Sequence, residues 1–343
     1  MSRLLAIGLV LAGWVMAGPA QAHPPYGLVT DQSGNAYFSD LETVWRLAAD
    51  GDLSVFRPAV PGRHVHELAI GPGGHVEGDE NRYDPQTQRF YSGLWQRALA
   101  GEEQSIVPLS ENPPRGAGVW QDAGGNRYVT EWVSSDDRRT ALIQRSRSGV
   151  VKVLYDAGAG VARRAPASVA SVGGMAFAAD GFLYFADGSV LRRLNPDGAV
   201  ETVYVGGAPS SLRGIAVTPD GRLLAADMES RTVIEIGADG ASSILYHGSS
   251  GWIPTAVALA GQRLLVLEAN ADHHEYVRRV RLVELRNGVA TVVASPPFAD
   301  VDQTSLEVPP AGPGSLSRGQ ILLGGIAATA VLAAAWFVMR KKT

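Results

Sequence analysis

The strongest constraint on this chain is a segment of about fourteen residues that recurs along it. Residues 214–227 read GIAVTPDGRLLAAD, and residues 174–187 read GMAFAADGFLYFAD. Four further copies, one of them degenerate and one a residue shorter, lie at residues 27–40, 118–131, 67–80 and 256–268. Self-similarity at this spacing is typical of repeat proteins, in which each unit is stable only when it packs against its neighbours.

Each unit continues into two further short apolar runs that are separated by an X-Gly pair. Examples are Asp197-Gly198 and Asp239-Gly240, each with a β-branched run on both sides. Such pairs indicate tight hairpins, because their turns require positive φ angles that glycine adopts without strain. Four strands in each of six units predict an all-β, six-bladed β-propeller over residues 23–297, which must close on itself to bury both faces of every blade.

Every unit carries an acidic residue at the end of its second predicted strand. These repeat acids are Asp40, Glu80, Glu131, Asp187, Asp227 and Glu268. A carboxylate at that position can accept hydrogen bonds from backbone N–H groups of the next turn. We therefore predict a structural role for the repeat acids; a functional ring of acids is the alternative.

The repeat pattern resembles NHL repeats and, more widely, the six-bladed propellers that include the SMP-30/gluconolactonase hydrolases. The resemblance covers residues 24–297 and rests on segments such as 214–227. It implies the propeller fold. NHL propellers are mostly binding modules, whereas the lactonases hold a divalent metal in the central channel with Glu, Asn and Asp side chains. The channel-lining positions that we align in this sequence contain no asparagine.

The best candidate site residues precede the innermost strands, where a side chain points at the mouth of the central channel. They are His66, Glu67 and Arg213. Glu67 takes a place that is glycine in other units, for example Gly174 and Gly214. Glycine there lets strands crowd the axis, so a glutamate would project its carboxylate towards the channel. A His–Glu pair can bind a metal or transfer protons; a solvated polar channel mouth is the alternative.

Two regions contain imidazole and carboxylate groups that suit a divalent metal such as calcium, manganese or zinc. The second unit has His66 and Glu67 among several other acids and histidines, and an insert at residues 81–88. The sixth unit has His273 and His274 in the loop after its second strand. On the repeat alignment this loop opens on the face where the second strands end, so it would add ligands to one metal site. A solvated surface loop is the other interpretation.

The two ends of the chain read as targeting and anchoring segments. Residues 1–22 have a basic start, an apolar stretch and an Ala-Gln-Ala site, as in a cleaved signal peptide. Residues 319–339 are uncharged and long enough to cross a bilayer, and basic residues follow at 340–342. We expect a Pro/Gly/Ser-rich linker at 298–318, a single transmembrane helix at 319–339 and a cytoplasmic tail at 340–343. An uncleaved N-terminal anchor and a processed C-terminal sorting signal are the alternatives.

Composition excludes several classes of function. The chain has no cysteine, which excludes disulfides, Cys-ligated zinc, iron–sulfur clusters and a thiol nucleophile. Residues 23–317 contain 25 basic and 34 acidic residues, a net charge of −9. A surface of that sign is a poor partner for nucleic acid.

Two hypotheses about function remain from the sequence. The first is an exported, membrane-anchored propeller, periplasmic or at the cell surface, that binds or scaffolds a protein or a small polar ligand on its face. The second is a metal-dependent hydrolase, lactonase- or esterase-like, or a lyase. In the second hypothesis His66 and Glu67 act at the channel mouth and Arg213 positions an anionic substrate.

Overall fold

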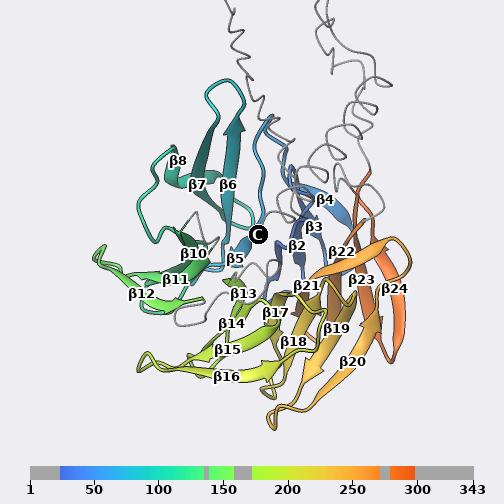
Figure 1. Cartoon of the computed structure of the whole chain (residues 1–343). Helices are drawn as coiled ribbons and strands as arrows, with labels where there is room; N and C mark the ends of the chain where they lie inside the picture. The colour runs from blue at the N-terminus through green and yellow to red at the C-terminus, as the bar shows by residue number, and fades with distance from the viewer. Residues whose placement is uncertain (1–23, 135–138, 158–171, 271–278, 298–343) are drawn as a thin grey trace, which may run out of the picture. The chain divides into compact units, whose positions relative to one another are not determined.

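A computed structural model describes residues 24–134, 139–157, 172–270 and 279–297. These residues form six four-stranded sheets, each a simple antiparallel meander of strands that are consecutive in sequence. The sheets stand around a common centre (Figure 1). The predicted all-β, six-bladed propeller is therefore confirmed. The predicted signal peptide, linker, transmembrane helix and tail, at 1–22, 298–318, 319–339 and 340–343, lie outside the described residues.

The strands are numbered along the chain, four to a blade. The innermost strands are β1 (Leu28–Thr30), β5 (Leu68–Ile70), β9 (Trp120–Gln121), β13 (Val172–Phe177), β17 (Leu212–Val217) and β21 (Trp252–Ala260). The second strands are β2 (Ala36–Ser39), β6 (Val76–Asp84), β10 (Arg127–Ser134), β14 (Leu183–Asp187), β18 (Leu223–Asp227) and β22 (Arg263–Asn270). The third strands are β3 (Val44–Leu47), β7 (Arg89–Arg97), β11 (Arg139–Arg145), β15 (Val190–Leu194), β19 (Thr232–Ile236) and β23 (Val280–Arg286). The outer strands are β4 (Leu53–Arg57), β8 (Glu103–Ser110), β12 (Val151–Asp156), β16 (Val200–Val205), β20 (Ser242–His247) and β24 (Val289–Ala294).

The ring closes by packing rather than by exchange of a strand. Every blade owns four consecutive strands. The innermost strand of the last blade, β21, contacts the innermost strand of the first blade, β1. The same kind of contact joins β13 to β17 and β17 to β21. Closure therefore depends on side-chain packing between the first and last blades, with no shared sheet.

The first turn of each repeat folds as its glycine predicts. Gly34, Gly74, Gly125, Gly181 and Gly221 all have φ between 75° and 87°. This left-handed region costs other residues a steric penalty that glycine avoids. In five of the six units one glycine thus fixes the turn between the first and second strands, and with it the register of the blade.

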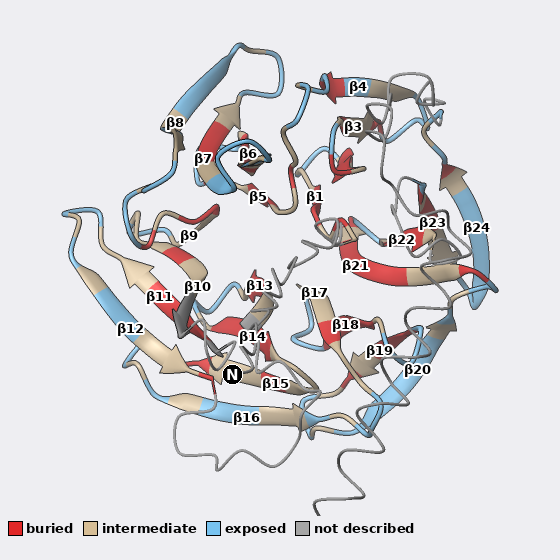
Figure 2. Ribbon diagram, turned by 45° about the horizontal axis from the view of Figure 1, so that its top comes forward, coloured by how far each residue is buried: buried red, intermediate tan, exposed pale blue. Residues whose placement is uncertain are grey.

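The hydrophobic core lies between neighbouring blades. Figure 2 shows buried residues on the inner and middle strands and exposed residues on the outer strands. In one cluster, Tyr128 and Leu142 of the third blade pack against Met175 and Phe185 of the fourth. Because each apolar face of a blade is covered by the next blade, the core is a ring of similar interfaces.

The repeat acids lie on one face of the ring, where the second strand of each blade ends; we call it the acid face. Three of them reach the outer strand of the preceding blade. Glu80 pairs with Arg57 of β4, Asp187 accepts a hydrogen bond from Tyr155 of β12 (2.6 Å), and Glu268 accepts one from Tyr246 of β20 (2.9 Å).

The other three repeat acids bind backbone N–H groups. Asp40 accepts bonds from Glu42 and Thr43 in the next turn. Glu131 accepts from Gly116, and Asp227 accepts from Ser211. The sequence analysis predicts backbone bonds for the whole set, and it does not foresee the links between blades.

Among the residues that the structure describes, none belongs to a helix long and apolar enough to cross a bilayer.

The links between blades generate a stability prediction. The Glu268 carboxylate is fully buried, and it is held by Tyr246 and by Arg281, whose Nε lies 2.7 Å away. Tyr246→Phe removes one hydrogen bond to a buried charge while it keeps the ring. We expect the free energy of unfolding to fall by about 1.5–3 kcal/mol in chemical denaturation. Tyr204→Phe is the matched control, because the described residues give the Tyr204 hydroxyl no partner. Equal effects of the two substitutions would contradict the proposed link.

Candidate functional site

The candidate site lies at the end of the central channel that opens on the acid face. Residues from all six innermost strands line a narrow cavity of about 20 Å³ around the axis, which opens into solvent. Its wall is mostly apolar, with Leu28, Leu68, Trp120 and Met175 among the lining residues. Glu67 is the acidic residue that the cavity lining contains. The structure therefore brings the Glu67 carboxylate to the axis.

Crowding explains why most blades have glycine where Glu67 lies. A Cβ atom on Gly214 would collide with Ala256 in the next blade, and one on Gly27 would come within 3.1 Å of the His66 carbonyl. Gly174 is equally confined, at 2.9 Å from the backbone of Arg213. Contacts below about 3 Å require the backbone to move, so a side chain at Gly174 or Gly214 would push blades apart, and one at Gly27 would fit only tightly. Blade two is the exception, since it has Glu67 at this position.

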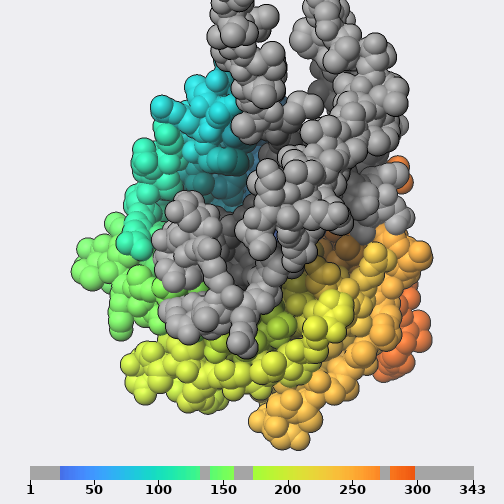
Figure 3. Space-filling model, in the orientation of Figure 1, coloured from blue at the N-terminus to red at the C-terminus, as the bar shows by residue number. Residues whose placement is uncertain are grey.

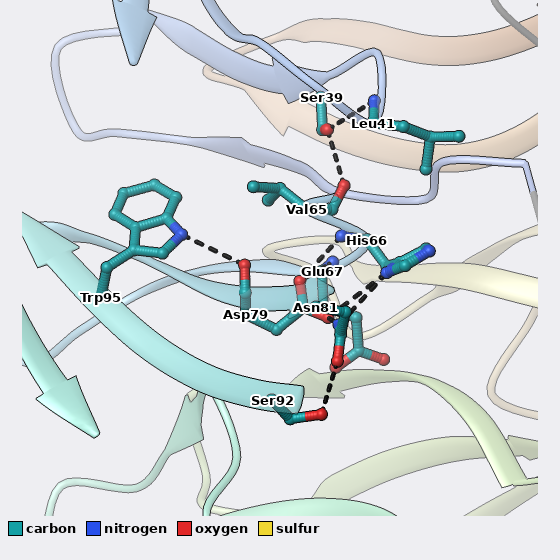
Figure 4. A network of polar contacts seen from close by, with 9 residues as sticks. All are labelled: Ser39, Leu41, Val65, His66, Glu67, Asp79, Asn81, Ser92 and Trp95. Carbon is teal, nitrogen blue, oxygen red and sulfur yellow. Dashed lines mark hydrogen bonds and ion pairs between the residues drawn. The ribbon is translucent and has the colours of Figure 1, made fainter. Parts of the chain in front are cut away.

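Asp79, on β6, holds the segment that carries His66 and Glu67 (Figure 4). Its Oδ1 accepts hydrogen bonds from the backbone N–H groups of His66 (2.7 Å) and Glu67 (2.8 Å). Its Oδ2 lies 3.6 Å from His66 Nδ1. One carboxylate thus fixes the backbone before β5 and also faces the imidazole.

Asn81 and Ser92 extend this network along the β6–β7 hairpin. Asn81 Nδ2 donates to Asp79 Oδ2 (2.6 Å) and lies 3.3 Å from His66 Nδ1, while Ser92 Oγ donates to Asn81 Oδ1 (2.7 Å). When neutral at Nδ1, the His66 ring accepts from Asn81; when protonated there, it pairs with Asp79. The network therefore has a partner for either protonation state of His66.

Burial and charge shift the pKa values of this cluster. Burial, and then the negative charge of Asp79, raise the pKa of Glu67 to about 7, although the charges of His66 and Arg213 oppose the shift. Burial lowers the pKa of His66, but the Asp79 carboxylate and the charge of Glu67 outweigh it and leave that pKa above 6.5. Burial and the charge of Glu67 also raise the pKa of Tyr26. Glu67 therefore titrates near neutrality, and the pKa of His66 lies above its ordinary value.

The Arg213 side chain, on β17 of the fifth blade, lies against Gly173 on β13 of the fourth blade. A Cβ atom on Gly173 would collide with Arg213 Nη1, so the guanidinium occupies the space that this glycine leaves. Its charge acts on the pKa values of both Glu67 and Tyr26. Arg213 thus adds a cation to the same mouth from the fifth blade.

The structure brings three of the residues predicted from sequence together. His66 and Arg213 both lie within electrostatic reach of Glu67. His273 and His274 lie outside the described residues. The sequence analysis missed Asp79 and Asn81 as site residues.

A signal for the two missed residues is present in the chain. Asp79 and Asn81 alternate along one strand, which points both side chains to the same side of the sheet. Residues 81–88 are predicted as an insert, whereas in the structure β6 continues to Asp84. Asn81 therefore follows Asp79 on the same strand.

The described residues contain no group of three His, Asp or Glu side chains arranged to hold a metal ion. The oxygen and nitrogen atoms of Asp79 and His66 that face each other already form the network of Figure 4. The mouth also contains the Glu67 carboxyl group, which titrates near pH 7 and feels the charges of His66 and Arg213. Such a set can bind a polar ligand and can exchange protons with it.

The raised pKa of Glu67 predicts a pH-dependent gain in stability on substitution. Because the folded state keeps the Glu67 proton up to about pH 7 and the unfolded state loses it near 4.5, stability from this group falls as pH rises between those values. Glu67→Gln should therefore be more stable than the parent at pH 8, by about 1–3 kcal/mol, and nearly equal to it at pH 4.5. Denaturant titrations at the two pH values measure the difference, with Glu42→Gln as an exposed control. A difference that is the same at both values would contradict the assignment.

Comparisons with known proteins find similarity in fold and none in sequence. No family model matches the chain, and no curated protein matches it in sequence. Among solved structures, a protein assigned provisionally as a gluconolactonase shares 16% identity with a TM-score of 0.51, over 78% of this chain and 88% of that one.

Two further propellers are similar. A gluconolactonase from Xanthomonas campestris shares 14% identity with a TM-score of 0.50, over 72% of this chain and 83% of that one. Virginiamycin B lyase from Staphylococcus aureus shares 15% identity with a TM-score of 0.47, over 78% of this chain and 83% of that one. The resemblance to gluconolactonase-type propellers that the repeats predict is thus confirmed for the fold.

Proposed function

We propose that this propeller is a binding module that holds a small polar ligand at the channel mouth on its acid face. The observation that carries the proposal is the convergence of polar groups from separate blades over an apolar floor. Tyr26 comes from the first blade, His66 and Glu67 from the second and Arg213 from the fifth. Concave sites with an apolar lining and a few polar groups are the usual form of small-molecule sites.

The size and chemistry of the mouth limit the ligand. The enclosed space is small, with a volume of about 20 Å³, and it opens into solvent, so a ligand would lie at the mouth rather than inside the channel. Leu28, Leu68 and Met175 suit the apolar part of a ligand. The titrating Glu67 suits a hydroxyl or amine group, because it accepts a hydrogen bond when ionised and donates one when protonated. A small ligand with both apolar carbon and hydrogen-bonding groups fits these properties.

The cellular context of the proposal comes from the sequence. A signal peptide at 1–22 and a transmembrane helix at 319–339 would place the propeller outside the cytoplasm, periplasmic or at the cell surface, with a cytoplasmic tail at 340–343. The net charge of −9 over residues 23–317 supports a partner other than nucleic acid. A protein bound on the same face is the alternative occupant.

A ligand screen with matched variants tests the proposal. In a thermal-shift screen of polyols, amines and small hydroxy compounds with the full chain, we expect at least one compound to raise the melting temperature. Glu67→Ala should weaken its binding by about tenfold or more, because a buried hydrogen bond to the ligand is lost. Glu42→Ala, on an exposed turn, should bind as the parent does. Binding that survives Glu67→Ala would place the ligand elsewhere.

A second candidate is a hydrolase, lactonase- or esterase-like, or a lyase at the same mouth. The specific observation in its favour is a carboxyl group with a pKa of about 7 next to an imidazole that is paired with Asp79. Groups that titrate near the working pH are effective general acids and bases. A divalent metal would need further donors beyond His66 and Glu67, and His273 and His274 are the ones that the sequence offers.

Two measurements on the same preparation test the second candidate. If it holds, the full chain purified without chelator should hydrolyse a lactone or ester from a panel, and Glu67→Gln should lower kcat/KM by about a hundredfold or more. Elemental analysis should find one calcium, manganese or zinc ion per chain, lost in Glu67→Ala. Turnover that Glu67→Gln leaves intact would reject the acid–base role, and a metal content that Glu67→Ala leaves intact would reject the metal site.

A further inference from the structure

The strands of the β6–β7 hairpin are the longest second and third strands among the described residues. β6 and β7 have nine residues each, and the pairing runs without interruption to Asp84 and Arg89. The chain before β5 still pairs with this hairpin at Asn81, through His64. Beyond Asn81 three more residues lead to the turn, about 10 Å of strand. Figure 1 shows the hairpin standing out from the ring.

The tip of this hairpin is aromatic and exposed. Tyr83 and Phe90 lie directly opposite each other, with ring centroids 4.7 Å apart, and Phe90 is 64% exposed. Arg82 lies over the ring of Tyr91, 4.5 Å from its centroid, and Arg89 pairs with Glu111. We define residues 82–91 as the aromatic tip. Figure 3 shows this region, in cyan, projecting past the green strands of the next blade.

The turn of the tip is ordered, which makes its exposure a fixed feature. Asp84 Oδ1 accepts hydrogen bonds from the N–H groups of Gln86 (2.9 Å) and Thr87 (3.3 Å). A stable turn holds Tyr83 and Phe90 side by side without burial of either ring. Paired aromatic rings with arginine beside them are the side chains that favour the interface between lipid and water.

The topology places the tip on the face from which the chain leaves the propeller. In a four-stranded meander, the turn between the second and third strands lies on the same face as the start of the first strand and the end of the fourth. The β6–β7 turn and the end of β24 at Ala294 are therefore both on the acid face. The predicted linker begins at residue 298, soon after the end of β24, and the predicted membrane span begins at residue 319.

We propose that the aromatic tip docks on the phospholipid surface of the membrane in which the chain is predicted to be anchored, so that the acid face is turned towards the bilayer. The proposal rests on that predicted anchor as well as on the tip. A linker of 21 residues spans roughly 25 Å as a flexible chain, which keeps the acid face near the bilayer. Two exposed rings bind lipid weakly on their own, but a tether raises the effective lipid concentration enough for weak contacts to hold.

The absence of cysteine in the chain makes a direct test possible. Gln86→Cys places one thiol in the turn of the aromatic tip, and Asp197→Cys places one in the β15–β16 turn on the opposite face. Each variant is labelled with an environment-sensitive fluorophore, and the full chain is reconstituted in phosphatidylcholine vesicles. We expect the emission from position 86 to move to shorter wavelength. Lipids that carry a spin label near the headgroup should quench it at least about twofold more than the emission from position 197.

Variants that lack the two aromatic rings provide a second test of the docking proposal. With Tyr83→Ser and Phe90→Ser added to Gln86→Cys, the wavelength shift and the extra quenching should disappear, while the circular dichroism spectrum stays that of the parent. If position 86 responds like position 197 in the parent, the docking proposal is overturned while the anchor stands. If a carbonate wash removes the chain from the vesicles, the anchor is absent and the docking proposal is overturned with it.

Discussion

Steric crowding at the propeller axis is the constraint on which the rest of this structure depends. Six innermost strands meet there, and glycines such as Gly174 and Gly214 let them approach, because a Cβ at either position would collide with the next blade. The crowding leaves few places where a functional side chain can enter the channel. Blade two supplies one of them, and its occupant is an ionisable residue, Glu67. The chemistry of the mouth is thus concentrated where the repeat is least regular.

In blade two, a hydrogen-bond network holds the segment that carries Glu67. Asp79 satisfies two backbone N–H groups before β5 and faces the His66 ring, and Asn81 and Ser92 hold Asp79 and His66 from the β6–β7 hairpin. Most repeat acids in the other blades serve the ring, through backbone bonds or links to the preceding blade. Blade two has such an acid in Glu80, and Asp79 beside it is available to organise the mouth. Structural and functional carboxylates therefore lie side by side on one strand.

Much of the fold could be predicted from the sequence because turn chemistry repeats. A glycine with positive φ marks the first turn of five of the units, and the apolar runs around it have the length of short strands. His66, Glu67 and Arg213 could be predicted as mouth residues because they precede or begin innermost strands. The alternation of Asp79 and Asn81 along one strand pointed to a shared side of the sheet, but their contacts with the His66 segment depend on the register between β5 and β6, which the degenerate second repeat conceals. The links from Asp187 and Glu268 to neighbouring blades were equally hidden, since they join residues more than twenty positions apart.

The Asp79 carboxylate organises the charged mouth, so the pKa of His66 should depend on it. Nuclear magnetic resonance of histidine-labelled protein, with the His66 signal assigned by its loss in His66→Gln, gives that pKa. We expect it to lie above 6.5 in the parent and to fall in Asp79→Asn, because the amide keeps an acceptor for the backbone but removes the charge. A His66 pKa at or below 6.5 that Asp79→Asn does not change would contradict this role of Asp79.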